Sequence, residues 1–156
     1  MKTLLNELVL KPGGSLLMMI GQSYLPEIIQ MTVPYLNYHW ILGYFTPGGQ
    51  SAQLWQKKVN TFWKPVLWFT KGDFKGEWIG DVIKSSENDK RFHEWGQSES
   101  GIRDLMKRFV KPGDTVLDPF MGGGTAGVIC KELKCEFIGV ELSEDTFNLA
   151  KVRLGD

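Results

Sequence analysis

Residues 115–141, TVLDPFMGGGTAGVICKELKCEFIGVE, decide the fold. The apolar start of this stretch, 115–117, is long enough for a short buried strand, and three successive glycines then make a tight turn into a helix over 125–133. A second strand over 136–140 ends at the acidic residue Glu141. This order predicts a strand–helix–strand unit with a glycine turn at the carboxyl end of its first strand, where open α/β sheets bind ligands.

The glycine turn suits a nucleoside with an anionic tail. Glycines let the backbone approach a ligand closely, and the N–H groups at the start of the following helix favour an anionic group such as a carboxylate or phosphate. Glu141 stands at the tip of the second predicted strand, where it is placed to accept hydrogen bonds from both hydroxyls of a ribose.

Two cofactors fit this description. Gly122, Gly124 and Gly127 satisfy the G-x-G-x-x-G pattern of a nicotinamide dinucleotide site, with an acid 17 residues after Gly124. Asp118 and Pro119 stand between the strand and the glycines, however, and a carboxylate there would repel a pyrophosphate but attract an ammonium or sulfonium group. S-Adenosylmethionine carries both cations, so charge favours it, and the dinucleotide remains the alternative.

Length and composition indicate one globular domain. The 156 residues, 42% of them hydrophobic, suffice to bury a core. Apolar runs are far shorter than the roughly 18 residues of a membrane-spanning helix, and no secretory signal pattern develops. We therefore expect a cytoplasmic protein with no membrane partner. Cys130 and Cys135 are expected to be small apolar residues, and His39 and His93 lie too far apart in sequence to suggest a metal site.

Charge is balanced overall, with 18 basic and 18 acidic residues, but it is uneven along the chain. Residues 57–91 hold eight bases, five acids and several tryptophans. Bases mixed with aromatic rings suit nucleic acid, because cations meet phosphates and rings stack on exposed bases. The candidate nucleic-acid contacts are Lys57, Lys58, Lys64 and Lys71. The alternative is that the tryptophans are core residues and the lysines a solvated face.

The remaining sequence predicts alternating helices and strands. The segments predicted as strands are 15–20, 38–46, 64–70 and 78–83. A short helix contains Leu4, Leu5 and Leu8, Ser23 caps a second helix, and 47–51 is a loop. A third helix begins at Ser100, because the apolar residues that follow it have helical spacing: Ile102, Leu105, Met106 and Phe109.

Residues 92–154 resemble the C-terminal part of the DNA amino-methyltransferases that modify adenine or cytosine, particularly the phage-like members in which target-side elements precede the cofactor loop. Weaker resemblance extends over 5–28 and 59–74. The resemblance implies an α/β, Rossmann-like, S-adenosylmethionine-dependent methyltransferase fold in one domain, with a target-side part (1–91) and a cofactor-binding part (92–156). The cofactor contacts that it implies are Asp118, Phe120, Met121, Gly122, Gly124, Thr125, Glu141 and Leu142, with His93, Gln97 and Ser98 as second-rank candidates.

One departure from this family concerns the catalytic motif. These enzymes use Asp-Pro-Pro-Tyr, or a variant of it, to accept the two hydrogens of the exocyclic amine and to stack on the flipped base. The sequence contains no such tetrapeptide, and Val33-Pro34-Tyr35-Leu36 lacks the acceptor. The catalytic residues therefore stay unknown. In the family's order the motif would precede residue 1, so we expect an N-terminally incomplete enzyme, either a portion of a longer chain or a shortened descendant.

Two functions follow from the resemblance. The first is an S-adenosylmethionine-dependent DNA methyltransferase, of the kind found in restriction–modification, acting on the amino group of adenine or cytosine. The second is a catalytically inactive module that retains the fold and binds the cofactor or nucleic acid. Because the sheet would lack a central strand, we also expect a homo-oligomer or a complementing N-terminal segment as a partner, besides DNA.

Overall fold

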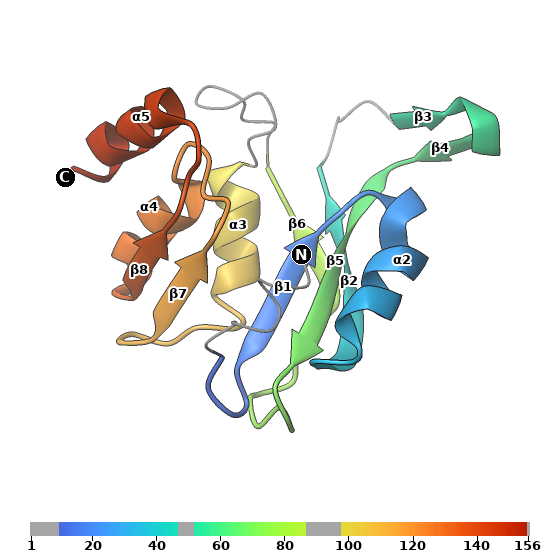
Figure 1. Cartoon of the computed structure of the whole chain (residues 1–156), viewed down its shortest axis with the longest axis horizontal. Coiled ribbons are helices and arrows are strands. Elements are labelled where there is room, and N and C mark those ends of the chain that lie inside the picture. The colour runs from blue at the N-terminus through green and yellow to red at the C-terminus, as the bar shows by residue number, and fades with distance from the viewer. Residues whose placement is uncertain (1–9, 47–51, 87–97, 156) are drawn as a thin grey trace. The chain divides into compact units, whose positions relative to one another are not determined.

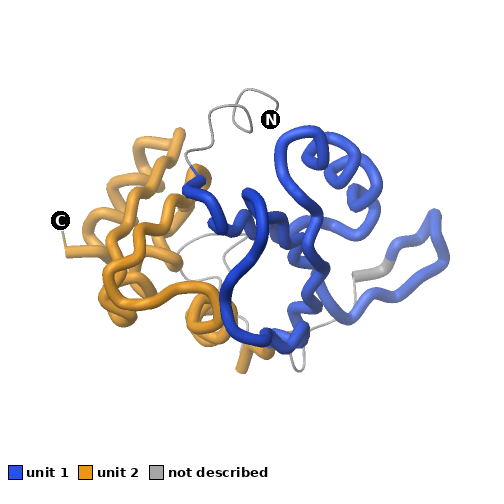
Figure 2. The backbone as a smooth tube through the Cα atoms, turned by 90° about the horizontal axis from the view of Figure 1, so that it is seen from below, with its two compact units in different colours: residues 1–45, 50–83 blue, residues 46–49, 84–156 orange. Residues whose placement is uncertain are grey.

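The computed structural model describes residues 10–46, 52–86 and 98–155. The chain divides into two compact units, one formed by residues 1–45 and 50–83 and the other by residues 46–49 and 84–156 (Figure 2). Each unit has a sheet and a hydrophobic core of its own.

The first unit is built mainly from strands (Figure 1). Its elements in chain order are β1 (Ser15–Met19), the 3-10 helix η1 (Gln22–Tyr24), α2 (Leu25–Thr32), β2 (Asn37–Phe45), β3 (Ala52–Leu54), the 3-10 helix η2 (Trp55–Lys57), β4 (Val59–Thr61), β5 (Trp63–Thr70) and β6 (Val82–Lys84), whose last residue lies across the boundary. Four strands form one sheet in the order β1-β5-β2-β6, and β3 pairs with β4.

β5 is the buried centre of the four-stranded sheet. It runs antiparallel to β1 and to β2, and every residue from Pro65 to Thr70 is buried. Successive side chains of a strand point to opposite faces, so both faces of β5 are covered. Leu67 and Phe69 pack against apolar residues of α2. Trp68 points to the opposite face, where its ring centroid lies 4.0 Å from that of His39 and 4.8 Å from that of Phe74. His39 lies at a register shift in β2.

The second unit contains the strand–helix–strand sequence. Its elements are α3 (Glu99–Met106), β7 (Thr115–Asp118), α4 (Thr125–Leu133), β8 (Glu136–Gly139) and α5 (Glu144–Leu154). β7 and β8 are parallel neighbours, with Val116 opposite Phe137. These two side chains pack on a core of Met106, Ile129 and Cys130. Apolar positions at helical spacing in α3 and α4 and β-branched or aromatic positions in the strands therefore meet in one core, as the sequence predicts.

Several predicted elements are confirmed, and some boundaries are wrong. The strands at 15–20, 38–46 and 64–70 and the helix over 125–133 are present. Ser23 does not cap α2, because it lies inside η1 and the cap residue is Tyr24. Of the strand predicted over 78–83, only Val82 and Ile83 form a strand, as part of β6, and α3 is capped by Ser98. The predicted N-terminal helix and the loop 47–51 lie outside the described residues.

The predicted α/β fold is confirmed, but the sheets are mixed in direction. β7 and β8 pair in parallel, whereas the pairs of β1 and β2 with β5 are antiparallel. In the described part of the chain, no helix has the length and apolar character needed to cross a lipid bilayer.

Candidate functional site

The glycine turn follows β7 and is hydrogen-bonded to the end of β8. The amide of Met121 donates to the carbonyl of Val140 (3.0 Å), and the amide of Val140 donates to the carbonyl of Asp118 (2.9 Å). Gly122 and Gly124 adopt positive φ angles of 50° and 75°. Residues with side chains rarely adopt this left-handed backbone, so the turn requires glycine at both positions.

Two carboxylates lie at this edge of the parallel pair. One oxygen of Glu141 accepts the amide of Gly122 (3.0 Å) and the other accepts the amide of Ser143 (2.9 Å). Asp118 Oδ1 accepts the amide of Phe120 (3.1 Å). The turn is thus fastened to the ends of both strands through acidic side chains, and these carboxylates concentrate negative charge at one place.

The electrostatics of Asp118 follow from this position. Burial raises the pKa of Asp118 above its ordinary value, the hydrogen bond from the Phe120 amide opposes that rise, and the negative charge of Glu141 adds to it. A half-buried carboxylate beside a second carboxylate is stabilised by any cation that enters the site. The pair therefore suits a positively charged ligand and disfavours a pyrophosphate.

Apolar side chains flank the carboxylates. Phe120 is 79% exposed, and Leu142, the residue after Glu141, is fully exposed. Large apolar side chains left in solvent beside polar groups are typical of a ligand-binding surface. Met121, in contrast, is buried, and a Cβ atom added to Gly139 would lie 2.2 Å from its sulfur. Met121 thus supports the turn from the core, while Phe120 and Leu142 are accessible to a ligand.

The third glycine of the G-x-G-x-x-G pattern has a packing role. A Cβ atom on Gly127 would lie 2.7 Å from the ring of Phe137 on β8 and 2.8 Å from Leu154 on α5. Glycine at this position lets α4 lie close to its strand and to the next helix. This requirement holds whichever nucleotide binds, so Gly127 does not favour the dinucleotide over S-adenosylmethionine.

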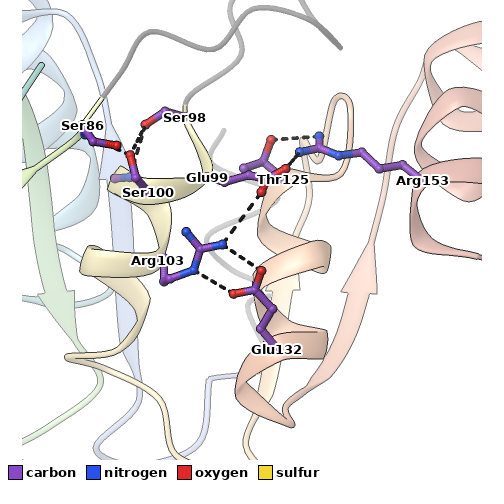
Figure 3. A network of polar contacts seen from close by, with 9 residues as sticks. Ser86, Ser98, Glu99, Ser100, Arg103, Thr125, Glu132 and Arg153 are labelled. Atoms are coloured by element: carbon purple, nitrogen blue, oxygen red, sulfur yellow. Dashed lines mark hydrogen bonds and ion pairs between the residues drawn. The ribbon is translucent and has the colours of Figure 1, made fainter.

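Figure 3 shows an ionic network next to the turn. It was not predicted from the sequence. Arg153 of α5 donates to the carbonyl of Gly123 (2.7 Å), to Thr125 Oγ1 (3.2 Å) and to Glu99 Oε1 (2.6 Å). Arg103 of α3 makes two hydrogen bonds of 2.7 Å each to Glu132 of α4. The second pair lowers the pKa of Glu132, chiefly through the hydrogen bond from Arg103. No local sequence pattern signals contacts over these separations.

The second-rank cofactor candidates have different positions. His93 and Gln97 lie outside the described residues. Ser98 is 3% exposed, and its hydroxyl oxygen accepts the amide of Gly101 (3.2 Å) as the N-cap of α3. The same hydroxyl bonds to those of Ser85 and Ser100. In the described structure Ser98 thus organises the start of α3.

The candidate nucleic-acid lysines separate into two places. Lys57 and Lys58 are exposed in the connection between β3 and β4, and Lys64 is an exposed residue near the start of β5. Lys71 follows the end of β5, about 23 Å from Lys64 at the usual rise of a strand. Trp55 is 80% exposed beside the first two lysines. The structure therefore brings Lys57 and Lys58 together and leaves Lys71 apart from them.

The tryptophans divide between the two interpretations of the sequence. Trp68 is 4% exposed and belongs to the core, whereas Trp55 and Trp78 project into solvent.

The cysteines are free thiols: Cys130 is fully buried, which raises its pKa to about 11, and Cys135 is half-buried. Within residues 10–46, 52–86 and 98–155, no cluster of three acidic, histidine or cysteine side chains is arranged to hold a metal ion.

The family model described as DNA methylase (N6_N4_Mtase) matches residues 2–152. The chain belongs to this DNA methylase family. Curated relatives of this family member include the type II methyltransferases M2.LlaDCHI of Lactococcus lactis subsp. cremoris (35% identical) and M2.DpnII of Streptococcus pneumoniae (34% identical). Each alignment is 118 positions long and covers 71% of the chain and 44% of the relative. The chain thus spans less than half the length of these relatives.

Solved structures of similar fold include a DNA methyltransferase. The M1.HpyAVI–SAM complex matches this family member with a TM-score of 0.80 at 21% identity, over 94% of the chain and 76% of its own length. The cytosine-N4-specific PvuII DNA methyltransferase matches with a TM-score of 0.77 at 18% identity, over 94% and 65%. At this identity the likeness concerns the fold, and it confirms the predicted Rossmann-like methyltransferase fold.

Proposed function

We propose that this member of the DNA methylase family binds S-adenosylmethionine at the glycine turn and takes part in methylation of an exocyclic amine of adenine or cytosine in DNA. The observation that carries the proposal is the pair of carboxylates, Asp118 and Glu141, that flanks the turn at the ends of two parallel strands. S-Adenosylmethionine supplies an electrophilic methyl group on a sulfonium ion.

Each residue of the turn has a specific role in this proposal. Asp118 attracts the ammonium and sulfonium charges, and Glu141 accepts hydrogen bonds from the ribose hydroxyls. A carboxylate has about four acceptor sites, and two of those on Glu141 hold backbone amides. Phe120 and Leu142, both exposed, provide apolar contacts for the adenine ring.

The start of α4 accommodates the carboxylate of the same ligand. Its N-cap residue is Gly124, in a left-handed conformation and without a side-chain cap. The first N–H groups of a helix have no intrahelical acceptor, so they and the helix dipole favour an anion at this position. Thr125, the first helical residue, and Gly122 complete the surface that we assign to the methionine part.

Methyl transfer requires groups that the turn does not provide. The amine to be methylated must give its hydrogens to a carboxylate or amide and a backbone carbonyl, and no Asp-Pro-Pro-aromatic tetrapeptide occurs in the 156 residues. We propose that residues 1–91 form the target side and residues 92–156 the cofactor side of one domain. The tetrapeptide would then come from a complementing N-terminal segment or from a partner chain that carries it, because a second copy of this chain lacks it as well.

The absence of this tetrapeptide favours one alternative. A chain that binds S-adenosylmethionine and never meets the missing motif would be a catalytically inactive binding module. Transfer of labelled methyl to duplex DNA, with and without an added segment that carries the motif, distinguishes the two. Methylation only in the presence of the segment supports the enzyme, and none under either condition supports the inactive module.

The assignment of the cofactor is tested by titration calorimetry with two ligands. We expect S-adenosylmethionine to bind with a one-to-one stoichiometry and NAD not to bind, because the carboxylates attract the sulfonium compound and repel a pyrophosphate. Isothermal titration of the purified chain with each compound measures both affinities. Binding of NAD without binding of S-adenosylmethionine would overturn the proposed function.

For the DNA side, we propose the β3–β4 hairpin as a contact surface. Residues 52–64 contain three lysines and no acid. Thr61, at the end of β4, accepts a hydrogen bond from Gln22 Nε2 (2.6 Å). This contact anchors the open end of the hairpin to η1. The exposed Trp55 beside Lys57 and Lys58 combines a stacking surface with cations for phosphates.

Replacing both hairpin lysines by glutamine is expected to weaken DNA binding and its salt dependence. Each phosphate contact contributes roughly 0.9 to the slope of log affinity against log salt, so the slope should fall by about 2 in Lys57→Gln/Lys58→Gln. Fluorescence anisotropy with a labelled duplex at several salt concentrations measures it. The control Lys107→Gln/Lys134→Gln removes the same charge from the second unit, and an equal change in both variants would contradict the assignment.

A further inference from the structure

Arg153, on α5, contacts the glycine turn. It is not among the cofactor contacts that the family resemblance implies. Its side chain is 10% exposed. One terminal nitrogen donates to the carbonyl of Gly123 (2.7 Å) and to Thr125 Oγ1 (3.2 Å), and the other donates to Glu99 (2.6 Å) (Figure 3). One guanidinium therefore joins α5 to both ends of the segment 123–125 and to the first turn of α3.

The turn needs such an external contact because of its composition. Three successive glycines have more backbone conformations available than any other tripeptide, so a single conformation is costly to maintain. The guanidinium is a rigid planar fork of donors, and it fixes the orientation of the peptide group whose oxygen it binds. The Gly123 carbonyl and the Gly124 amide belong to one peptide group, so fixing the carbonyl also restrains this amide, which donates to Met121 (2.9 Å). It thereby limits the motion of the rest of the turn, where the Gly122 amide donates to Glu141 (3.0 Å).

Glu99 holds the other side of Arg153. It lies in the first turn of α3, directly after the buried N-cap Ser98, so its backbone is fixed by the helix start. Its second oxygen lies 3.8 Å from Arg103, which binds Glu132 of α4. The carboxylate thus keeps the guanidinium plane directed at the turn.

We infer that Arg153, oriented by Glu99, is a positioning residue that holds the glycine turn in its ligand-binding conformation. This inference rests on the proposed function for the identity of the ligand, S-adenosylmethionine. Its structural part, the restraint of the turn, is independent of any ligand. Arg153 does not itself contact the ligand in this inference: it acts on the peptide groups of Gly123 and Gly124 from the core side.

The test compares Arg153→Lys with Arg103→Lys. Lysine keeps the charge at position 153 but has no planar fork to bind Gly123 and Glu99 together. The control variant makes the same substitution at an arginine of the same network. Arg103 binds Glu132 and does not touch the turn. Amide hydrogen exchange of Gly122 and Gly124, relative to the Glu136 amide at the opposite end of β8, is measured in the ligand-free chain.

We expect the Gly122 and Gly124 amides to exchange about tenfold faster in Arg153→Lys and to be unchanged in Arg103→Lys. Affinity for S-adenosylmethionine should fall about tenfold in the first variant only, since loss of a charge-assisted hydrogen bond has an effect of this size. Unchanged exchange in Arg153→Lys, with similar thermal midpoints for the two variants, would overturn the inference and leave Arg153 a purely structural link. If the wild-type chain binds no S-adenosylmethionine, the proposed function fails, and the exchange data still decide the role of Arg153.

Discussion

An Asp118→Asn variant is expected to bind S-adenosylmethionine roughly 10- to 100-fold more weakly, because a charge-assisted interaction with the ligand's cations is worth about 1.5–3 kcal/mol. Asparagine has nearly the shape of aspartate, and its carbonyl oxygen can still accept the amide of Phe120, as Oδ1 of the aspartate does at 3.1 Å. The turn therefore keeps its conformation, and the loss reports the missing charge.

The same substitution is expected to leave the protein at least as stable. Burial raises the pKa of Asp118 in the folded state, with a further rise from Glu141. For a group with a raised folded-state pKa, its contribution to stability is present below the unfolded pKa and lost as pH rises through the folded pKa. At neutral pH the ionised Asp118 therefore opposes folding, and asparagine removes that cost. Carboxylates that bind ligands commonly lower stability in this way.

Cofactor binding should also depend on pH through Asp118. Because its pKa is raised, protonation begins at a higher pH than for an ordinary aspartate, and affinity should fall as pH decreases through that range. In Asp118→Asn the affinity should be low and nearly independent of pH over the same range. Calorimetric titration at a series of pH values measures both curves.

The matched control is Glu136→Gln, which removes one negative charge at the opposite end of β8, where the side chain is exposed. We expect this variant to bind S-adenosylmethionine as the wild type does and to show the same pH dependence. Wild-type affinity in Asp118→Asn would contradict the assignment of the site. A fall in the thermal midpoint of Asp118→Asn below that of Glu136→Gln would contradict the account of its pKa.

The strand–helix–strand unit was predictable because its signals are local. The helix over 125–133 has the predicted bounds, since a glycine turn precedes it and Lys134, in a left-handed conformation, ends it. The two strands of the unit, β7 and β8, are short apolar runs between polar residues. Asp118 is the last residue of β7, and Glu141 comes two residues after the end of β8, so the parallel pairing of these strands brings them to one edge.

The β3–β4 hairpin was not predicted because its turn has no recognisable signal. The usual Asn-Gly or Asp-Gly pair is absent, and the chain reverses through η2 and a left-handed Lys58 with φ of 53°. The strand predicted over 78–83 forms only at its end. Trp78 is fully exposed there, so the aromatic content of the segment does not reflect burial.

The network around Arg153 was unpredictable for a different reason. Arg153 lies 30 residues from Gly123 and 54 residues from Glu99 along the chain. An arginine near the end of a helix is ordinarily explained by the helix dipole or by solvent exposure. The partners of Arg153 are fixed only when α3, α4 and α5 pack together, which is tertiary information.

A Gly124→Ala variant is expected to lose about 2–5 kcal/mol of unfolding free energy, from about 1–2 kcal/mol of left-handed strain and about 1–3 kcal/mol of overpacking. Gly124 has a φ angle of 75°, and a Cβ atom there would lie 3.3 Å from Cβ of Ala150 and 3.6 Å from Leu154. Ala150 is fully buried on α5, so its methyl group has no free space to move into. Turn and helix must then shift apart.

Gly113→Ala is the matched control, because it separates strain from crowding. Gly113 has a φ angle of 88°, and a Cβ atom there would meet no atom within 4 Å. This variant should lose only the left-handed strain, roughly 1–2 kcal/mol, and should bind S-adenosylmethionine as the wild type does. Gly124→Ala should lose at least tenfold in affinity as well, since the displaced residue belongs to the turn. Urea denaturation and calorimetry measure the two quantities.

A second substitution at Ala150 tests whether crowding is the cause. Ala150→Gly removes the contacted methyl group at a cost of about 1 kcal/mol for glycine inside a helix. If crowding accounts for the larger loss, Gly124→Ala should destabilise the Ala150→Gly background only by its left-handed strain, as Gly113→Ala destabilises the wild type. The affinity for S-adenosylmethionine should recover in the same double variant. An equal cost of Gly124→Ala in both backgrounds would show that strain alone, and not the approach of α5 to the turn, requires glycine at position 124.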